Sequence, residues 1–311
     1  MTANAKRVEQ SETAELHGAS KELNLEHPAS SLVEVDFGAE SHIGSVRRDN
    51  QDHYLVIRAD RSLQSVLSNL PAGALPSSVE ETAYGMVVAD GLGGMPEGGL
   101  ASSMALRKLV DLVAKTPDWV MRMNRRKAVT VKRRVIQRFQ QIDKALREHG
   151  ARDPRLAGMG TTLTATVSLG ADLFVGHIGD SRAYLLRGDT LHQLTRDDTL
   201  AEAMIEAGVA REEDEKVKGM RRVLTAALGS TANPSDPDVQ HLNLHNGDQL
   251  MLCTDGLTES VDNETIGSIL RGAKSAEVAC RALIDAALRA GGDDNITVVL
   301  ARYNFPTQTT P

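Results

Sequence analysis

The chain is poor in the residues and runs that mark several common protein classes. It has only two cysteines, Cys253 and Cys280, and their spacing matches no paired motif. Neither a disulfide framework nor a zinc cluster is therefore expected. No stretch of about 18 apolar residues occurs, and the N-terminus has no apolar core of the kind that a secretory signal requires. We expect a cytoplasmic protein without a membrane span.

Basic charge is also in deficit. The chain has 35 lysines and arginines against 42 aspartates and glutamates, and its formal net charge is −7. This balance argues against broad nucleic-acid binding. Apolar residues make up 41% of the 311 positions, which is enough for a substantial core. A length prior allows about two domains, although mixed α and β folds of about 250 residues often form one.

One stretch, Tyr84–Leu100, combines an apolar run, a carboxylate and a glycine-rich turn. Its sequence is YGMVVADGLGGMPEGGL, and a pattern of helical spacing follows it. Asp-Gly also suits a plain hairpin turn, but no second strand follows. A phosphate-binding loop does not fit, because Gly99 stands where the P-loop requires lysine. No lysine or arginine lies between Tyr84 and Leu106, so the acidic loop indicates a cation instead.

Aspartates recur at the ends of apolar runs and next to flexible turns. Burying an unpaired carboxylate costs several kcal/mol, and the obvious basic partners near these turns are Arg47 and Arg182. Divalent cations would resolve the conflict, and all-oxygen ligands favour Mg²⁺ or Mn²⁺ over zinc. For Asp180 a hairpin turn remains an alternative, since a strand follows it. An exposed turn remains an alternative for Asp293-Asp294. The aspartates of this pattern are Asp52, Asp90, Asp180, Asp255, Asp293 and Asp294.

The remaining pattern predicts both strands and helices. Early strands are expected at Leu32–Phe37 and His53–Ile57, followed by an inserted loop from Arg61 to Thr82. A dense apolar region then predicts an antiparallel meander. Its three strands are Thr161–Leu169, Leu173–Ile178 and Arg182–Leu186.

A long amphipathic helix is predicted from Val120 to His149. Its apolar positions fall four, four, three and four residues apart from Val131 to Leu146, which gives one buried face. The other face is strongly basic. It is either a solvated face or a surface that binds an acidic partner or a phosphate-rich surface. Its basic residues are Arg122, Arg125, Arg126, Lys127, Lys132, Arg133, Arg134 and Arg138.

Six motifs occur in order between Val33 and Tyr303, and together they resemble one family. The motifs are GSVRRDNQD, VVADGLGGMPEGG, GMGTTLTA, HIGDSRAYLL, LCTDGL and GGDDNITVV. The set resembles the bacterial form of the metal-dependent protein phosphatases, the type 2C serine/threonine phosphatases. The resemblance implies an α+β fold, a four-layer α-β-β-α sandwich in which two antiparallel sheets surround a dinuclear metal site. We expect a disordered tail over 1–31, a catalytic domain over 32–305 with a flap at about 199–220, and a short tail over 306–311.

The resemblance also implies roles for individual residues. Asp90 would bridge two metal ions, one of them also bound by the Gly91 carbonyl. Asp255 and Asp294 would complete the shell of one ion, and Asp52 would reach the other through water. The remaining two roles concern a third, weaker ion and the substrate: Asp180 would bind that ion together with Asp255, and Arg47 would bind the substrate phosphate.

The implied function is hydrolysis of phosphoserine and phosphothreonine on proteins by a metal-bridging water or hydroxide. The implied cofactors are two Mn²⁺ or Mg²⁺ ions, with a possible third. Partners would be phosphorylated proteins and a serine/threonine kinase or its targets, with no nucleic acid and no membrane, and the chain would act as a monomer. Two alternatives stay open: a catalytically silent binding module, and a dinuclear hydrolase of other phosphoesters.

Two positions depart from the family pattern. Leu92 stands where many eukaryotic relatives carry a histidine that is proposed to protonate the leaving group. Asp198, in LTRDDT, stands where relatives commonly have histidine. Neither change removes an expected metal ligand, so an active enzyme is predicted.

Overall fold

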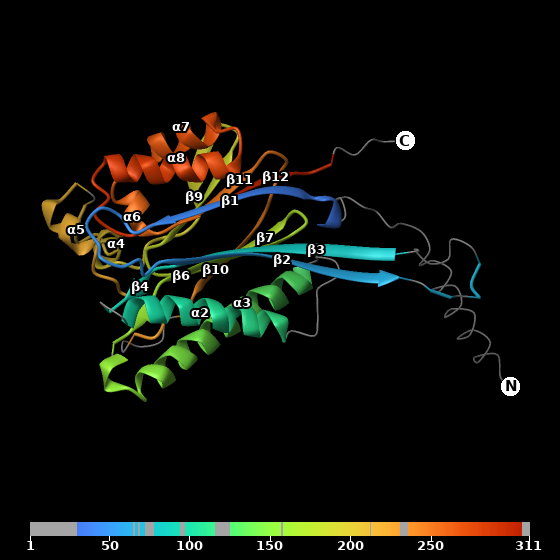
Figure 1. Cartoon of the computed structure of the whole chain (residues 1–311), viewed down its shortest axis with the longest axis horizontal. Helices are drawn as coiled ribbons and strands as arrows, with labels where there is room; N and C mark the ends of the chain where they lie inside the picture. Colours follow the sequence, from blue (N-terminus) through green and yellow to red (C-terminus); the bar gives the residue numbers. More distant parts are fainter. Residues whose placement is uncertain are drawn as a thin grey trace.

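Two five-stranded antiparallel sheets lie face to face, and a pair of helices covers each outer side (Figure 1). This arrangement comes from a computed structural model, which describes residues 30–64, 66–67, 69–71, 78–93, 97–115, 125–156, 158–211, 213–230 and 236–306. The four layers confirm the predicted α-β-β-α sandwich.

The first sheet has the strand order β1-β12-β11-β8-β9 and is covered by helices α7 (Asn263–Gly272) and α8 (Ala276–Arg289). Its strands are β1 (Glu34–His42), β12 (Ile296–Asn304), β11 (Gln249–Cys253), β8 (Arg182–Arg187) and β9 (Thr190–Gln193).

The second sheet has the order β10-β7-β6-β3-β2 and is covered by α2 (Glu97–Ala114) and α3 (Arg125–Gly150). Its strands are β10 (Asp238–Asn243), β7 (Asp172–Ile178), β6 (Leu163–Leu169), β3 (Ser78–Ala89) and β2 (His53–Gln64).

Within the described residues, the smaller elements are a two-stranded sheet, three short α-helices and two 3₁₀ turns. They are β4 (Gly91–Leu92) with β5 (Gly160–Thr161), α4 (Leu200–Glu206), α5 (Glu215–Met220), α6 (Asp255–Thr258), and the turns η1 (Ser30–Leu32) and η2 (Pro154–Leu156).

The period-two alternation of the central strands builds three separate apolar layers. In β12, Val298 and Leu300 pack under α8, whereas Val299 faces the space between the sheets. In β3, Val87 packs under α2 and α3, whereas Val88 faces the other sheet. Successive side chains of a strand point to opposite faces. Both strands are therefore apolar on both faces.

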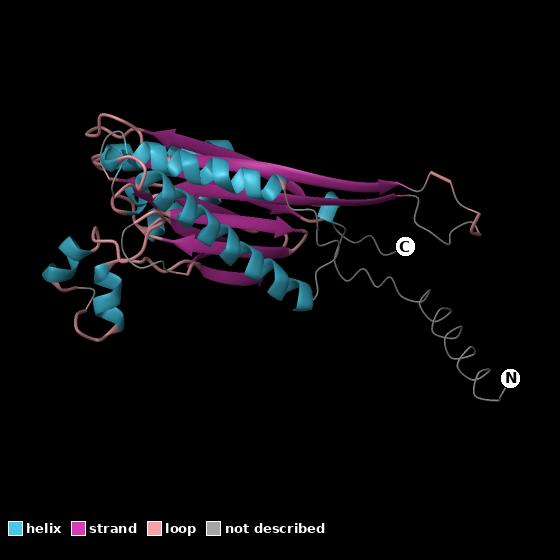
Figure 2. Cartoon of the chain, turned by 90° about the horizontal axis from the view of Figure 1, so that it is seen from below, coloured by secondary structure: helices cyan, strands magenta, loops and turns pink. Residues whose placement is uncertain are grey.

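The predicted loop from Arg61 to Thr82 is wrong at both of its ends. Strands β2 and β3 pair in register from His53↔Ala89 to Gln64↔Ser78. They extend well beyond the body of the sheets (Figure 2). Polar groups satisfy each other there: the Asp60 carboxylate accepts hydrogen bonds from Arg58 and from the Thr82 hydroxyl. The extension was missed because its exposed residues lack the apolar alternation of a half-buried strand.

The predicted meander is correct for β6 and β7 but wrong for the next strand. Strands β6 and β7 form a hairpin, whereas β8 pairs with β11 and β9 in the other sheet. The chain thus crosses between the sheets at 179–181. Asp180 lies in this crossing and not in a hairpin turn.

The basic helix forms as α3, which begins at Arg125 and ends at Gly150. Val135, Phe139, Ile142 and Leu146 are buried as predicted, and Val131 is partly buried in the same cluster. Residues 120–124 and most of both predicted tails, 1–29 and 307–311, lie outside the described residues.

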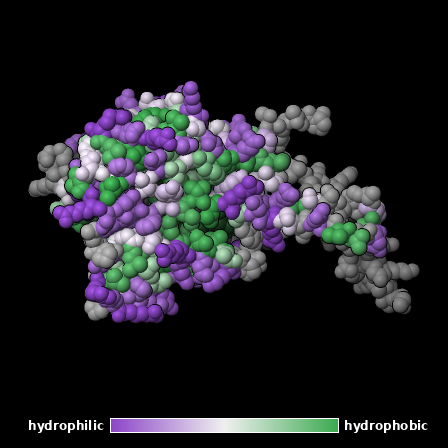
Figure 3. All heavy atoms as spheres, viewed as in Figure 1, coloured by the Kyte–Doolittle hydropathy of each residue, from purple (hydrophilic) through white to green (hydrophobic). Residues whose placement is uncertain are grey.

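Apolar side chains gather near the middle of the face seen in Figure 3. An apolar cavity of about 160 Å³ lies between the second sheet and its helices, with Ile57, Val113 and Val131 in its lining.

None of the helices that the structure describes is long and apolar enough to cross a membrane.

Candidate metal centre and cleft

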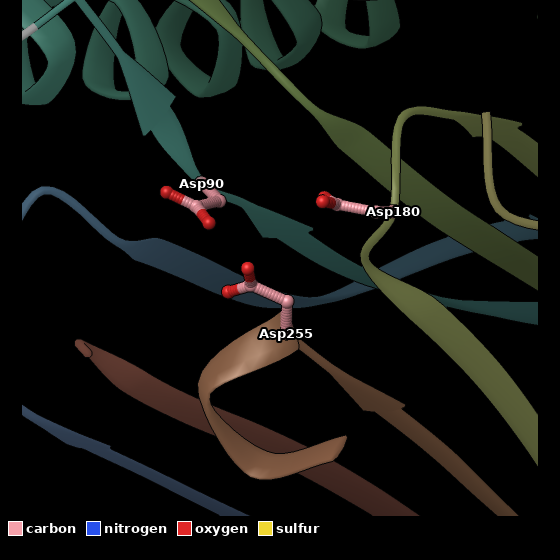
Figure 4. Close-up of side chains that lie close together, drawn as sticks. All are labelled: Asp90, Asp180 and Asp255. Carbon is pink, nitrogen blue, oxygen red and sulfur yellow. The ribbon is translucent and has the colours of Figure 1, made fainter. Parts of the chain in front are cut away.

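Three aspartates from three separate elements converge at one end of the sandwich (Figure 4). Asp90 directly follows β3, Asp180 lies in the crossing between β7 and β8, and Asp255 is the first residue of α6 after β11. Each offers a carboxylate oxygen within 4.8 Å of the others. Three of the six aspartates singled out in the sequence are thus neighbours in space.

Asp52, which directly precedes β2 of the second sheet, lies beside this group. Its position is fixed by hydrogen bonds to residues of the first sheet. The Thr254 hydroxyl donates a 2.8 Å hydrogen bond to Asp52 Oδ2, and Thr254 Oγ1 accepts a 3.0 Å bond from the Thr297 amide. Asp52 is 5% exposed. Its other oxygen, Oδ1, is buried without a hydrogen-bond partner among the described residues.

Without a bound cation, burial and mutual repulsion disfavour the ionised form of these carboxylates. Burial raises the pKa of Asp52 to about 6 and that of Asp180 to about 7. Burial, followed by repulsion from neighbouring aspartates, raises the pKa values of Asp90 and Asp255 well above the usual range. Desolvation and like charges both disfavour the ionised form of a carboxyl group.

The donor set fits a hard divalent cation. In the described part of the chain, Asp52 Oδ1 and Asp255 Oδ1 are buried oxygens that lack a partner. The two arginines named in the sequence analysis pair with other carboxylates: Arg47 with Asp294, and Arg182 in a two-pronged pair with Asp197. Oxygen-only donors of this kind suit Mg²⁺ or Mn²⁺.

Gly91 occupies a position that admits no larger residue. A Cβ at Gly91 would lie 2.1 Å from the Gly98 carbonyl oxygen at the start of α2. The residue also pairs with Thr161 in the small β4–β5 sheet. Its place directly after Asp90 is consistent with the predicted carbonyl ligand, which stays a prediction.

Three hydroxyl residues hold Asp90 in place, and the sequence reasoning assigned them no role. The Asp90 carbonyl accepts hydrogen bonds from the Thr162 amide at 2.9 Å and the Thr161 hydroxyl at 2.8 Å. The Asp90 amide donates to Thr162 Oγ1, which also bonds Ser181 beside Asp180. The paired threonines of GMGTTLTA were the available signal, but their partners are distant in sequence.

Arg47 and Asp294 meet at the same end of the molecule. The Arg47 guanidinium donates to Asp294 Oδ2 at 2.5 Å, and the arginine side chain is 56% exposed. Both residues line a cleft of about 490 Å³ that also exposes Asp90, Asp180 and Asp255. Among the described residues, Asp294 and Asp52 do not join the group whose oxygens lie within 4.8 Å of one another.

Asn295 fixes the loop that carries Arg47. Its side-chain amide donates to the carbonyls of Ile43 and Asp49 at 2.9 Å each. Its oxygen accepts from the Gln51 amide at 2.8 Å. One buried side chain thus spans the loop on both sides of Arg47. The sequence reasoning did not single out Asn295, although it directly follows the Asp293-Asp294 pair.

The structure gives Asp198, one of the two departures from the family pattern, a hydrogen-bonding role, and it places Leu92, the other departure, in the cleft. Asp198 Oδ2 accepts a 2.9 Å bond from the Gly179 amide, and the Asp198 amide donates back to the Gly179 carbonyl. Gly179 has a φ of 110°, so this pair fixes the turn that presents Asp180. Leu92 lines the cleft and brings no proton donor to it.

Comparison with known proteins defines the family. The family model described as protein phosphatase 2C matches residues 74–271. The chain is 35% identical over 233 residues to the serine/threonine protein phosphatase PstP of Mycobacterium tuberculosis, covering 74% of this chain and 43% of PstP. It is 32% identical over 220 residues to the serine/threonine phosphatase stp of Listeria welshimeri, covering 71% of this chain and 84% of that relative. The chain belongs to the protein phosphatase 2C family, which confirms the predicted family.

Solved structures agree with this family and with the fold. The crystal structure of Mycobacterium tuberculosis PstP/Ppp has a TM-score of 0.69 and 30% identity, covering 87% of this chain and 99% of that one. The S. agalactiae serine/threonine phosphatase has a TM-score of 0.71 and 28% identity, with 86% and 99% covered. The PstP catalytic domain solved in complex with two manganese ions has a TM-score of 0.68 and 29% identity, with 88% and 99% covered. The chain spans less than half the length of full PstP.

Proposed function

We propose that this protein hydrolyses phosphoserine and phosphothreonine monoesters on proteins with the help of Mn²⁺ or Mg²⁺. One observation carries the proposal: Asp255, whose Oδ1 is buried without a partner among the described residues, lines one cleft with Asp90, Asp180 and the exposed guanidinium of Arg47. A cation site and a phosphate-binding arginine in one cleft are what metal-assisted phosphoester hydrolysis requires. The manganese ions of the related PstP domain support this assignment.

The proposed ligands are those implied by the sequence. Asp90 would bridge two ions, with the Gly91 carbonyl, Asp255, Asp294 and a water held by Asp52 completing their shells. Asp180 would hold a third, weaker ion together with Asp255. When bound, such a pair of cations lowers the pKa of a bound water and so supplies hydroxide near neutral pH.

The chain's own residues would bind and orient the substrate. Arg47 presents a planar fork of N–H donors that matches two phosphate oxygens. In this structure one of those donors is held by Asp294. Use of Asp294 as a metal ligand would free the guanidinium for the substrate. Leu92 cannot donate a proton, so protonation of the leaving oxygen is left to water in the cleft.

The setting follows from the proposed reaction. Its partners would be phosphoproteins and the kinase that phosphorylates them, and the compartment would be the cytoplasm, where such ATP-dependent kinases work. The chain would act as a monomer. The segment 199–220, with α4 and α5, would serve as the flap beside the cleft.

The basic face of α3 is a second, separate hypothesis for partner binding. Exchange of Arg133 and Arg134 for glutamate should slow dephosphorylation of a phosphoprotein while sparing a small aryl phosphate. The same exchange at Arg281 on α8 is a matched control. Equal slowing of both substrates would reject docking on α3.

Substrate comparison tests the proposed function. Phosphate release from phosphoserine and phosphothreonine peptides and from an aryl phosphate should require added Mn²⁺ or Mg²⁺. An aryl phosphodiester of the same leaving group should react far more slowly. Preference for the diester would favour the alternative hydrolase, and lack of turnover on every ester would favour a silent binding module.

A further inference from the structure

A second arginine, Arg222, lies in the cleft and has no role in the reaction proposed above. It lines the cleft of about 490 Å³ together with Arg47, Asp90 and Asp255. It also lines an adjoining cavity of about 440 Å³ that contains Asp180 and Asp255. Arg222 therefore stands where the two hollows meet beside the carboxylates.

The backbone around Arg222 is firmly placed. The Leu200 amide donates to the Val223 carbonyl, and the Thr225 amide donates to the Asp198 carbonyl, at 2.8 Å each. Leu224 also forms a β-bridge with Thr199. The segment that follows α5 is thus tied to the turn that presents Asp180, so the arginine is held over the cleft although its side chain is 69% exposed.

The guanidinium is oriented by a glutamate and keeps spare donors. Its Nε donates to Glu259 Oε1 at 3.0 Å, and one terminal nitrogen donates to Oε2 at 2.7 Å. A guanidinium has five N–H donors, so the others stay available. The hydrogen bond and charge of Glu259 raise the pKa of Arg222, and the charges of Asp255 and Asp294 add to this. Exposed ion pairs of this type are worth about 1 kcal/mol or less, so a substrate anion can compete with Glu259.

One phosphoryl group does not need both arginines. Arg47 and the proposed cations already match its oxygens, and the cleft is much larger than a phosphate. We propose that Arg222 binds a second anionic group of the substrate, the carboxylate or phosphate of a residue close to the phosphorylated serine or threonine. This inference rests on the proposed function and specifies its substrate class as acidic or multiply phosphorylated segments.

The test is the charge preference of the 311-residue chain with Mn²⁺. Phosphothreonine peptides would carry glutamine, glutamate or a phosphonate analogue of phosphoserine at one neighbouring position, scanned on both sides. At the best position the wild type should prefer an anionic neighbour by about tenfold in kcat/KM. The glutamate and phosphonate peptides distinguish the carboxylate from the phosphate.

Variants of Arg222 should change this preference in a graded way. Arg222→Ala should have nearly equal kcat/KM for peptides with an anionic and a neutral neighbour. Arg222→Lys should keep part of the preference, and Arg222→Glu should prefer the neutral neighbour. Arg281→Ala is the matched control, because Arg281 is also exposed and bonded to a glutamate but lies on α8. It should retain the full preference. A wild type indifferent to neighbouring charge, or an undiminished preference in Arg222→Ala, would overturn the proposal.

Two further variants separate Arg222 from its neighbours in the cleft. Arg48 also lines the cleft, and loss of the preference in Arg48→Ala but not in Arg222→Ala would show that Arg48 makes the contact instead. If Arg222 only neutralised Glu259, the Arg222→Ala/Glu259→Gln double variant would regain the wild-type preference, which would also overturn the proposal. A double variant that stays indifferent supports it.

Direct binding separates this proposal from the proposed reaction. Peptides in which a phosphonate replaces the phosphothreonine can be titrated by fluorescence anisotropy without any turnover. The dissociation constant should show the same preference for an anionic neighbour, and Arg222→Ala should remove it. If no peptide were hydrolysed, the proposed function would fail, while this binding preference would still decide the role of Arg222.

Discussion

Thr254 and Asp52, 202 residues apart in the chain, are joined by a 2.8 Å hydrogen bond that leaves one oxygen of the Asp52 carboxylate free. That oxygen is buried and has no partner in the described part of the molecule. The Thr254 hydroxyl in turn accepts from the amide of Thr297 on β12. A side chain that bonds one oxygen of a carboxylate sets the direction of the other, which is the usual function of residues behind a metal ligand.

Thr254→Val should therefore weaken Mn²⁺ binding. Loss of a residue that orients a ligand typically reduces metal affinity by about 10- to 100-fold. Calorimetric titration of chelator-treated protein measures the change. Thr254→Ser keeps the hydroxyl and should bind nearly as the wild type does. An unchanged dissociation constant in the valine variant would show that Asp52 does not need this partner.

The metal-free protein should lose stability as the pH rises. The pKa values of Asp52 and Asp180 are raised to about 6 and about 7 in the folded chain, and burial is the main cause. An acid whose pKa is raised by folding favours the folded state when protonated. Its contribution is complete below a pH of about 4 and is lost as the pH passes through about 6 to 7.

Thermal unfolding in the presence of a chelator checks this expectation. The Tm should fall by several degrees between pH 5 and pH 7.5, and Mn²⁺ should restore it at pH 7.5. Asp90→Asn removes one repelling charge and should raise the metal-free Tm at pH 7.5. Asp111→Asn on the exposed side of α2 is the control and should leave the pH dependence unchanged. A flat Tm in the wild type would contradict the repulsion among these carboxylates.

Asp198→Ala should destabilise the turn that carries Asp180. The variant leaves the amide of Gly179 without the acceptor that it has in this structure. Loss of such a partner costs about 1 to 3 kcal/mol of unfolding free energy. Urea unfolding measures it, and Asp198→Asn, which retains a carbonyl acceptor, should recover most of the loss. Equal stability of the alanine and asparagine variants would reject this role.

Arg47→Ala should reduce kcat/KM on phosphopeptides by about 100-fold or more, the effect expected on loss of an electrostatic stabiliser. The kcat/KM of Arg47→Lys should fall between those of the wild type and Arg47→Ala, because an ammonium group keeps the charge but not the planar fork. Arg58→Ala is a suitable control, since Arg58 is also exposed and paired with an aspartate but lies on β2. Wild-type kinetics in Arg47→Ala would exclude phosphate binding by Arg47.

The three clustered aspartates could be predicted from sequence because their signal is local. Asp90, Asp180 and Asp255 each follow an apolar run and stand beside a flexible residue, and buried strands that end together bring such residues together. The family and its layers followed from six motifs in order. The crossing at Asp180 could not be predicted from the pattern, because β7 and β8 are both apolar and their short connection resembles a hairpin turn.

The residues that support the site were missed for a different reason. Thr162 bonds the amide of Asp90 across 72 positions, and Asn295 bonds the Asp49 carbonyl across 246. A polar residue in a motif does not show which distant backbone group it satisfies. The extended ends of β2 and β3 were missed because both of their faces are largely polar. These strand ends are recognised only from the backbone pairing of β2 with β3 in the structure.

The central claim is that buried carboxylates bind cations that drive phosphoester hydrolysis. The most direct measurement is phosphate release from a phosphothreonine peptide during a Mn²⁺ titration of chelator-treated protein, with Asp90→Asn and Asp255→Asn measured side by side. The wild type should release no phosphate without metal and gain activity as Mn²⁺ is added. Both variants should show almost no turnover at any Mn²⁺ concentration. Release that persists in excess chelator, or wild-type turnover in either variant, would contradict the claim.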